Sequence, residues 1–253
     1  MLSKDDQTLC NLAETAAGKV AQLLQSEFAL LNSVQSNAGK DIKLDADRKA
    51  EELLFNMLMP VGANILSEES GSTNFNCLDG PCWILDPLDG TFNYNRGFPA
   101  YAVSIAYWVD QQPVFGVIYD IANARCYTGQ VGVGAWCNGN IIQVSTVNSR
   151  DQAVLATGFP AGRNYDGTSL QQFIKSVQNY KKIRMIGSAA ISLANVASGV
   201  FDLYMEQDIW IWDVAAGIAL VQAAGGTVNK TTIDTHWKLD VQAWNARFGL
   251  EDE

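Results

Sequence analysis

The sequence has little charge, few basic residues and one histidine. Charged residues make up 17% of its 253 residues, well below the roughly 25% of an average soluble domain. Asp and Glu number 27 against 17 Lys and Arg, so the formal net charge is −10. A chain this acidic is repelled by phosphate polymers, which excludes a nucleic-acid binder that works by neutralising the backbone. The single histidine, His236, lies in a polar stretch typical of a loop, and we expect no catalytic role for it.

Cysteine is sparse, and the sequence lacks long apolar runs. The five cysteines are odd in number and form no CxxC pair, unlike the disulfide framework of small secreted proteins. We therefore expect free thiols, even for the nearby Cys77 and Cys82, and a cytoplasmic protein. The uncharged stretch 185–201 contains Ser, Asn and Gly and is shorter than the roughly 20 residues of a membrane span. The first residues mix acidic and apolar side chains, whereas a signal peptide has a basic segment before an apolar one.

Apolar residues are plentiful. They make up 48% of the chain, with 10% aromatics, which is enough to offset chain entropy and excludes a disordered protein. We predict a single domain, 1–253, which a change of composition near residue 150 divides into subdomains 1–150 and 151–253. Apolar residues at spacings of three and four predict an amphipathic helix over 3–31 and a second over 47–59, which Pro60 ends.

The middle of the chain is rich in β-branched and aromatic residues, which predicts strands. The strands expected before residue 150 are 83–85, 101–109, 114–119 and 125–128. A turn at 111–113 is expected to join two of them as an antiparallel hairpin. After residue 150, predicted strands alternate with predicted helices: strands 154–157, 183–186, 201–205 and 241–244, and helices 168–179, 189–198 and 213–224. This alternation indicates helices layered against a sheet, in an α+β fold.

The most chemically informative stretch is Trp83-Ile84-Leu85-Asp86-Pro87-Leu88-Asp89-Gly90-Thr91. Strand-forming residues bring Asp86 and Asp89 to the end of a strand, and Pro87 stiffens the backbone between them. Asp89-Gly90 turns the chain, so Thr91 is expected near the start of a helix, where free N–H groups suit a phosphate. Carboxylates beside an anion site require cations between them. Taken alone, Asp-Pro and Asp-Gly are also ordinary turn formers.

Three further acids occupy similar places. Glu68 follows a short predicted strand at 64–66, Asp213 begins an Ala-rich helix, and Asp47 heads the second helix. The two aspartates are also ordinary helix N-cap residues. Carboxylates that converge without a cation raise one another's pKa values and destabilise the fold. Ligands that are all oxygen select a hard cation, Mg²⁺ first, with Mn²⁺ or Ca²⁺ as lesser alternatives.

Together these segments resemble the inositol monophosphatase family of the lithium-sensitive, Mg²⁺-dependent sugar-phosphatase superfamily. The resemblance rests on Ser67-Glu68-Glu69-Ser70, on the W-x-x-D-P-[ILV]-D-G-T pattern of 83–91, and on Trp212-Asp213-Val214-Ala215-Ala216-Gly217 followed by Gly225-Gly226. Similarity extends from Asp41 through Asn245. It implies a layered αβαβα sandwich of the inositol monophosphatase and fructose-bisphosphatase type. N-terminal helices would cover an antiparallel sheet, and a mixed α/β part would follow.

The resemblance also implies roles for individual residues. The implied metal ligands are Glu68, Asp86, Asp89, Asp213 and the carbonyl oxygen of Leu88. Thr91 and Asp47 match the pair that polarises the attacking water beside Glu68, and the N–H groups of Gly90 and Thr91 would cradle the phosphate. The implied contacts with the rest of the substrate are Asp89, Asp213, Gly187, Ser188, Ala189 and Glu206. Trp210 stands where the family frequently has a polar residue, so we expect a narrowed or reshaped alcohol pocket.

The resulting hypothesis is a Mg²⁺-dependent phosphomonoesterase acting on a small polyol phosphate, with myo-inositol monophosphate as the expected substrate. Alternatives within the superfamily are 3′-phosphoadenosine 5′-phosphate phosphatase, fructose-1,6-bisphosphatase and histidinol-phosphate phosphatase. A non-catalytic relative is a further alternative, because fold alone guarantees no activity. The resemblance implies two or three Mg²⁺ ions per site, with Mn²⁺ as a substitute, inhibition by Li⁺, and a homodimer. We expect neither a nucleic-acid nor a membrane partner.

Overall fold

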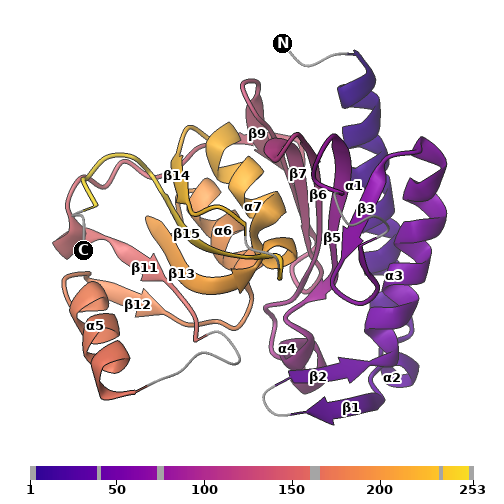
Figure 1. Ribbon diagram of the computed structural model, residues 1–253, viewed down its shortest axis with the longest axis horizontal. Coiled ribbons are helices and arrows are strands. Elements are labelled where there is room, and N and C mark those ends of the chain that lie inside the picture. The colour runs from indigo at the N-terminus through magenta and orange to yellow at the C-terminus, as the bar shows by residue number, and fades with distance from the viewer. Residues whose placement is uncertain (1–3, 39–40, 73–76, 160–165, 234–235, 251–253) are drawn as a thin grey trace.

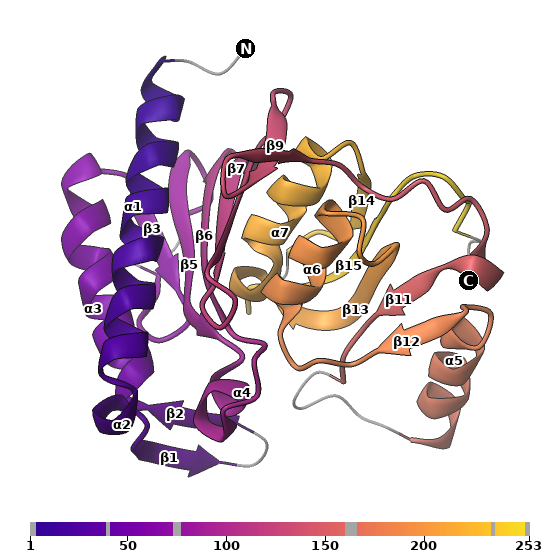
Figure 2. The ribbon, with the colours of Figure 1, turned by 180° about the vertical axis from the view of Figure 1, so that it is seen from behind.

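Helices and sheets alternate in layers across the protein. The computed structural model describes residues 4–38, 41–72, 77–159, 166–233 and 236–250. Helices α1 (Lys4–Ser26) and α3 (Asp45–Leu58) cover one face of a large sheet, and α6 (Ala189–Ala197) and α7 (Ile211–Ala223) separate it from a smaller sheet (Figure 1). Helix α5 (Gly167–Val177) covers the far side of the smaller sheet, and the reverse view shows the same order (Figure 2). The αβαβα sandwich that the sequence implied is confirmed.

The first helices differ from the prediction at their ends. The predicted helix 3–31 is two helices, because α1 ends at Ser26 and α2 (Phe28–Leu31) follows a turn at Glu27; Ser3 lies outside the described residues. The polar stretch that follows contains β1 (Val34–Ala38), which pairs antiparallel with β2 (Asp41–Leu44) and was not predicted. Leu44 is the N-cap of α3, and Asp47 is the third helical residue rather than the cap. A 3₁₀ turn, η1 (Met59–Val61), ends this part.

The larger sheet has eight strands within the described ranges, in the order β10-β9-β8-β7-β6-β5-β3-β4. It was expected to be antiparallel, but it is mixed, because β3 pairs parallel with β5. Their bounds are β3 (Asn64–Ser67), β4 (Gly71–Ser72), β5 (Pro81–Asp89), β6 (Ala102–Val109), β7 (Gln112–Asp120), β8 (Arg125–Gln130), β9 (Gly134–Cys137) and β10 (Asn140–Ile142). The predicted hairpin is β6–β7, but its turn is at Asp110-Gln111, both with positive φ, and not at 111–113. Two residues with positive φ match the twist of paired strands, as in type I′ turns.

The smaller sheet has the order β12-β11-β13-β15-β14 among the described strands. Their bounds are β11 (Val154–Ala156), β12 (Lys182–Arg184), β13 (Leu203–Trp210), β14 (Thr227–Lys230) and β15 (Lys238–Trp244). β14 was not predicted, and β13 ends five residues beyond the predicted strand 201–205. The register of β13 shifts between Glu206 and Ile209, and such a bulge interrupts the alternation that marks a strand. The short helix η2 (Arg150–Gln152) links the two sheets, and α5, α6 and α7 match their predicted ranges within two residues.

Glycines let α7 lie directly on the larger sheet. A Cβ on Gly116 of β7 would lie 2.3 Å from the carbonyl oxygen of Ala216, and one on Gly129 of β8 would lie 2.5 Å from Leu220 Cα. Larger residues would push the helix away from the sheet. The helix closes a buried apolar core between the two sheets, and α1 and α3 close a second core on the outer face of the larger sheet. This packing brings the first turn of α7, with Asp213, to the end of β5.

All five cysteines are free thiols. The thiols of Cys77 and Cys82 hydrogen-bond each other, which lowers the pKa of Cys77 to about 7. Among the described helices, none combines the length and apolar character needed to cross a membrane.

Candidate active site

Two buried carboxylates lie where β5 meets α4 (Thr91–Arg96). In a regular strand, residues three apart face opposite sides of the sheet. The register of β5 shifts between Asp86 and Asp89, and both side chains line one cavity. The Leu88 N–H donates a hydrogen bond to Asp86 Oδ1 at 3.0 Å. The bulge, with Pro87 at its centre, therefore aims two acids at one place.

Gly90 and Thr91 connect this strand to the helix. Gly90 has a φ of +85°, and a Cβ there would lie 2.7 Å from the Ala100 carbonyl oxygen, so the position requires glycine. Thr91 Oγ1 lies 2.9 Å from both the Leu88 carbonyl oxygen and Asp47 Oδ1. Asp47 is 3% exposed and lies behind Thr91 rather than lining the cavity. Its other oxygen accepts the Leu44 N–H at 2.6 Å, which closes the capping box of α3.

Glu68 reaches the cavity from β3. This strand runs parallel to β5 with Ser67 opposite Leu85, and the Glu68 N–H donates to the Leu85 carbonyl oxygen at 3.2 Å. Because parallel strands end at the same edge of a sheet, Glu68 lies beside Asp86. The carboxyl groups of these two residues hydrogen-bond each other.

The segment after Glu68 is fixed from outside the cavity. Glu51 of α3 accepts hydrogen bonds from the N–H and the hydroxyl of Ser70. Lys43 Nζ lies 2.7 Å from Glu69 Oε2, and Lys43 also lines the cavity. The ion pair leaves Glu69 directed at Lys43, so Glu68 is the member of the acidic pair that faces the site.

The start of α6 holds Asp89 in place. Ser188 is the N-cap of this helix, and its hydroxyl donates to Asp89 Oδ2 while accepting the Ile191 N–H at 3.1 Å. The Ala190 N–H donates to the same Asp89 oxygen at 2.9 Å. Free N–H groups and the helix dipole favour a negative charge at this end of a helix. Asp89 therefore links the two halves of the chain.

The smaller sheet and α7 supply the remaining acids. Glu206 of β13 accepts a hydrogen bond from the Tyr204 hydroxyl at 2.7 Å. A Cβ on Gly158 would lie 2.7 Å from either carboxylate oxygen of Glu206, so glycine gives that carboxylate its room. Asp213 lies in the first turn of α7, and its N-cap is Trp210, so the alternative reading of Asp213 as the cap was wrong.

One cavity of about 350 Å³ collects these groups. The sequence-predicted residues that line it are Glu68, Asp86, Leu88, Asp89, Gly90, Thr91, Gly187, Ser188, Ala189, Glu206 and Asp213. Of the predicted set, Asp47 alone lies outside the lining, one hydrogen bond away through Thr91. Side chains from positions 68 to 213 thus meet in one place.

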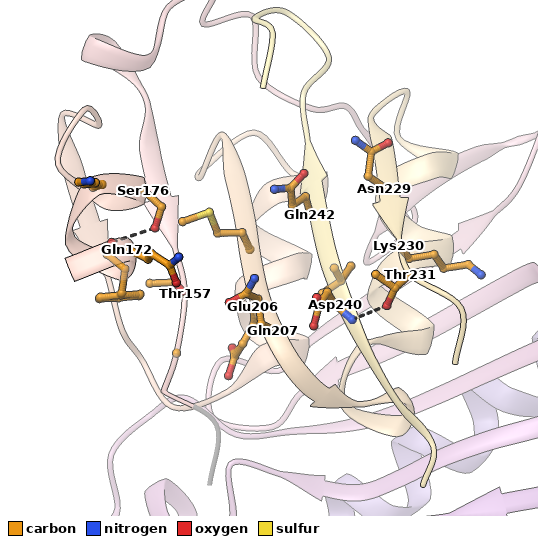
Figure 3. Close-up of a pocket in the computed structure, with 15 residues that line it drawn as sticks. Thr157, Gln172, Ser176, Glu206, Gln207, Asn229, Lys230, Thr231, Asp240 and Gln242 are labelled. Carbon is orange, nitrogen blue, oxygen red and sulfur yellow. Dashed lines mark hydrogen bonds between the residues drawn. The ribbon is translucent and has the colours of Figure 1, made fainter. Parts of the chain in front are cut away.

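A larger groove of about 710 Å³ adjoins this cavity and shares Thr157, Gly158 and Glu206 with it. It lies between α5 and strands β13, β15 and β14 of the smaller sheet (Figure 3). Its polar lining is mainly amides and hydroxyls: Gln172, Ser176, Gln207, Asn229, Thr231 and Gln242. The predicted acidic residues therefore come together in the smaller cavity and not in this groove.

Burial raises the pKa values of the acids that line this cavity and of Asp47 behind it. Loss of hydration is the main cause throughout, and it raises the pKa of Asp47 to about 6, of Glu68 to about 8 and of Asp89 to about 6. The pKa values of Asp86 and Asp213 also lie well above the ordinary range, from burial first and then from repulsion by Glu68 and Asp89. Such a group of acids is costly in charged form unless cations lie among them.

The donor set fits a hard cation. It consists of carboxylate oxygens and one backbone carbonyl, the ligands that Mg²⁺ accepts. Across the described residues, no three Asp, Glu, His or Cys side chains stand close enough together to enclose a metal ion by themselves. Mg²⁺ commonly takes one or two carboxylates and keeps several water molecules. Acids spread around one cavity of about 350 Å³, with room for water molecules, are compatible with that habit.

Sequence reasoning missed several residues around the cavity. The Asn93 amide donates to the Ile186 and Gly187 carbonyl oxygens at 2.7 and 3.1 Å, which fixes the loop before α6. Tyr204 orients Glu206, and Phe159 lines the cavity. The role of Asn93 could not be read from its own segment, because the loop that it holds lies more than ninety residues further along the chain. The position of Asn93 two residues after Thr91 was the one available signal.

The layered fold and the acid-lined cavity define a phosphatase of the class that the sequence resemblance implied. A profile of the inositol monophosphatase family matches residues 5–248. The chain belongs to this family and is a phosphoric monoester hydrolase.

Curated relatives and solved structures agree with this assignment. The inositol-1-monophosphatase of Mesorhizobium japonicum is 36% identical, over 87% of this chain and 85% of that protein. Inositol monophosphatase 1 of Xenopus laevis is 32% identical, over 88% of this chain and 80% of its own. The crystal structure of the extragenic suppressor protein suhB from Bartonella henselae covers 95% of both chains, with a TM-score of 0.84 and 34% identity. Inositol monophosphatase from Anabaena (Nostoc) superposes with a TM-score of 0.83 and 31% identity, over 96% of this chain and 93% of that one.

Proposed function

We propose that the protein is a Mg²⁺-dependent phosphomonoesterase that hydrolyses a small polyol phosphate, with myo-inositol monophosphate as its substrate. The observation that carries the proposal is the shared cavity of Glu68, Asp86, Asp89 and Asp213 beside the Gly90–Thr91 turn. The relatives named inositol monophosphatase support the choice of alcohol.

Four carboxylates and one carbonyl form the proposed metal-binding group: Glu68, Asp86, Asp89, Asp213 and the Leu88 carbonyl. When bound, two or three Mg²⁺ ions, or Mn²⁺ in their place, would lower the pKa of a water molecule and offset charge on the phosphate and on the departing oxygen. The Ser188 hydroxyl and the Ala190 N–H orient Asp89. Orientation of this kind is worth about 10-fold to 100-fold in metal affinity at comparable sites.

Thr91 and Asp47 form the proposed proton-handling pair. The Thr91 hydroxyl lies within hydrogen-bond distance of Asp47 Oδ1, so Asp47 can take up the hydroxyl proton as the threonine oxygen takes a proton from the attacking water. Glu68 would hold the same water from the other side. Gly90 and Thr91 line the cavity, and their N–H groups would bind the phosphate oxygens.

The C-terminal half would bind the alcohol. Gly187, Ser188 and Ala189 would face it from the start of α6, and the Glu206 carboxylate would accept hydrogen bonds from its hydroxyl groups. Carboxylates beside the alcohol repel a second phosphate, which disfavours bisphosphate substrates. A homodimer remains part of the proposal through family resemblance.

The direct test is phosphate release from a panel of esters, with Mg²⁺ and with a chelator. The panel contains myo-inositol 1-phosphate, 3′-phosphoadenosine 5′-phosphate, fructose 1,6-bisphosphate and histidinol phosphate. The highest kcat/KM is expected for inositol phosphate, and chelation should abolish all release. A strong preference for the bisphosphorylated nucleotide would replace the proposed substrate, and release that persists with chelator would remove the metal from the mechanism.

A further inference from the structure

Trp210 is held between two partners at the mouth of the catalytic cavity. Its ring is stacked on that of Trp212, with centroids 4.8 Å apart and an angle of 8° between the planes. Lys238 Nζ lies over the Trp210 ring, 4.7 Å from its centroid. Because two near-parallel rings at this spacing leave no room for an ammonium group between them, the lysine occupies the face opposite Trp212.

The lysine is itself anchored. Lys238 is the partner of Trp210 in the antiparallel pairing of β15 with β13, and its ammonium lies 2.8 Å from Asp208 Oδ2. Asp208 lies in the bulge of β13 with a φ of +57°, and its N–H donates to Asp240 Oδ1 at 2.9 Å. The cation therefore contacts the ring from a position that backbone pairing and an ion pair both determine.

With both faces covered, Trp210 presents only its edge to the cavity. The residue is 37% exposed and lines the catalytic cavity next to Ile209 and close to Glu206 in the strand. A stacking platform needs a free ring face, so this indole is not placed to bind a planar group by stacking. A ring edge made of C–H groups instead limits space, and the cavity of about 350 Å³ is near the lower end of the roughly 300–1,000 Å³ typical of ligand sites.

We infer that Trp210 is a specificity-determining wall that limits the size of the alcohol, and that Lys238 and Asp208 are its positioning residues. This inference rests on the proposed function and narrows it: the substrates are phosphate esters of compact alcohols, and nucleoside phosphates are excluded by size. Removing the indole opens the alcohol side and keeps the backbone of Trp210, which is the N-cap of α7 and hydrogen-bonds Asp213.

The test compares kcat/KM for adenosine 2′-monophosphate and for glycerol 2-phosphate. The wild-type protein prefers the small ester, and Trp210→Ala should raise the ratio of nucleotide to glycerol ester at least 10-fold. Trp136→Ala is the matched control, since Trp136 is a partly exposed tryptophan on β9 that lines neither the cavity nor the groove; its ratio should stay within twofold of wild type. The inference is wrong if an active Trp210→Ala enzyme keeps the wild-type ratio, or if it selectively loses activity on the nucleotide.

The positioning role has its own readout. Lys238→Met should raise the same ratio by roughly threefold, and Lys238→Arg, which keeps a cation over the ring, should restore it. Equal ratios in the Met and Arg variants would remove Lys238 from the inference. If the wild-type protein releases phosphate from no ester, the proposed function fails, but the inference about Trp210 can still be tested by binding. Calorimetry then gives the ratio of dissociation constants for the two esters in wild type and in Trp210→Ala, and an unchanged ratio contradicts the role of Trp210 as a wall.

Discussion

The two halves of the chain build their parts of the site in different ways. In residues 1–150 the functional groups are fixed by local backbone geometry: the bulge of β5, the left-handed Gly90, and the cap of α3 that holds Asp47. In the second half they depend on contacts between distant segments: Glu206 lies at the register shift of β13, which pairs with β15, and Ser188 at the start of α6 bonds Asp89. We expect the first half to determine the rate of phosphate chemistry and the second to determine which alcohol is accepted. Asp213 is the exception, because α7 carries it across to the acids of the first half.

The largest expected effect tests whether Asp213 acts together with the acids of the first half. Asp213→Asn and Asp89→Asn should each lower kcat by at least about 100-fold, since each replaces a charged ligand in the proposed metal group. The effect should be the same for every ester, although the two residues come from different halves. Phosphate release and circular dichroism measured together separate lost chemistry from lost folding. Wild-type rates in either folded variant would contradict the assignment of both as ligands.

The next effect concerns the first half alone. Thr91→Ala removes the hydroxyl that lies 2.9 Å from Asp47 Oδ1, and kcat should fall by about 100-fold with little change in KM, as expected for a proton-handling group. Thr91→Ser keeps the hydroxyl and is the matched control, so it should recover most of the rate. A Ser variant as slow as the Ala variant would show that the threonine methyl, rather than the proton path, is what matters.

The sequence predicts the first half of the site better than the second. Asp86, Asp89, Gly90 and Thr91 lie within six residues, where turn and strand preferences act directly. By contrast, the bulge of β13 and the ion pair of Lys238 with Asp208 depend on β15, thirty residues further along the chain. The sequence therefore predicted only that Trp210 narrows or reshapes the alcohol pocket, and not that Trp212 and Lys238 hold its ring.

The same limit explains the errors in the fold. Long amphipathic or apolar segments such as α3 and α7 were located within two residues. β14 (Thr227–Lys230) is short, has three polar residues out of four and lies at a sheet edge, so its strand character comes from pairing with β15 rather than from its own residues. Similarly, β1 and β2 are polar and pair only with each other in the described part of the chain.

The third prediction concerns stability and the first half's buried acids. Without metal, burial raises the pKa of Asp47 to about 6 and of Glu68 to about 8, above the roughly 3.9 and 4.3 of an unfolded chain. The folded state then holds protons that the unfolded state has released, so stability falls as pH rises from about 4 to 8. Mg²⁺ binds the folded, ionised acids and should oppose that fall. Thermal melts with and without Mg²⁺ should therefore show a larger increase in Tm at pH 8 than at pH 5.5, and an equal increase at both would contradict these shifts.

The smallest expected effect separates the catalytic cavity from the groove beside it. Glu206→Gln keeps the shape of a side chain that accepts the Tyr204 hydroxyl at 2.7 Å but weakens its hydrogen bonds to the alcohol by about 1 kcal/mol, so KM for inositol phosphate should rise roughly fivefold at nearly constant kcat. Asp240→Asn is the matched control, because Asp240 lines only the groove (Figure 3) and its Asn oxygen can still accept the Asp208 N–H. Steady-state kinetics should show KM unchanged in this control. An equal rise in both variants would mean that the alcohol extends past Gly158 into the groove, and the second half of the chain would then recognise a larger substrate than the cavity alone admits.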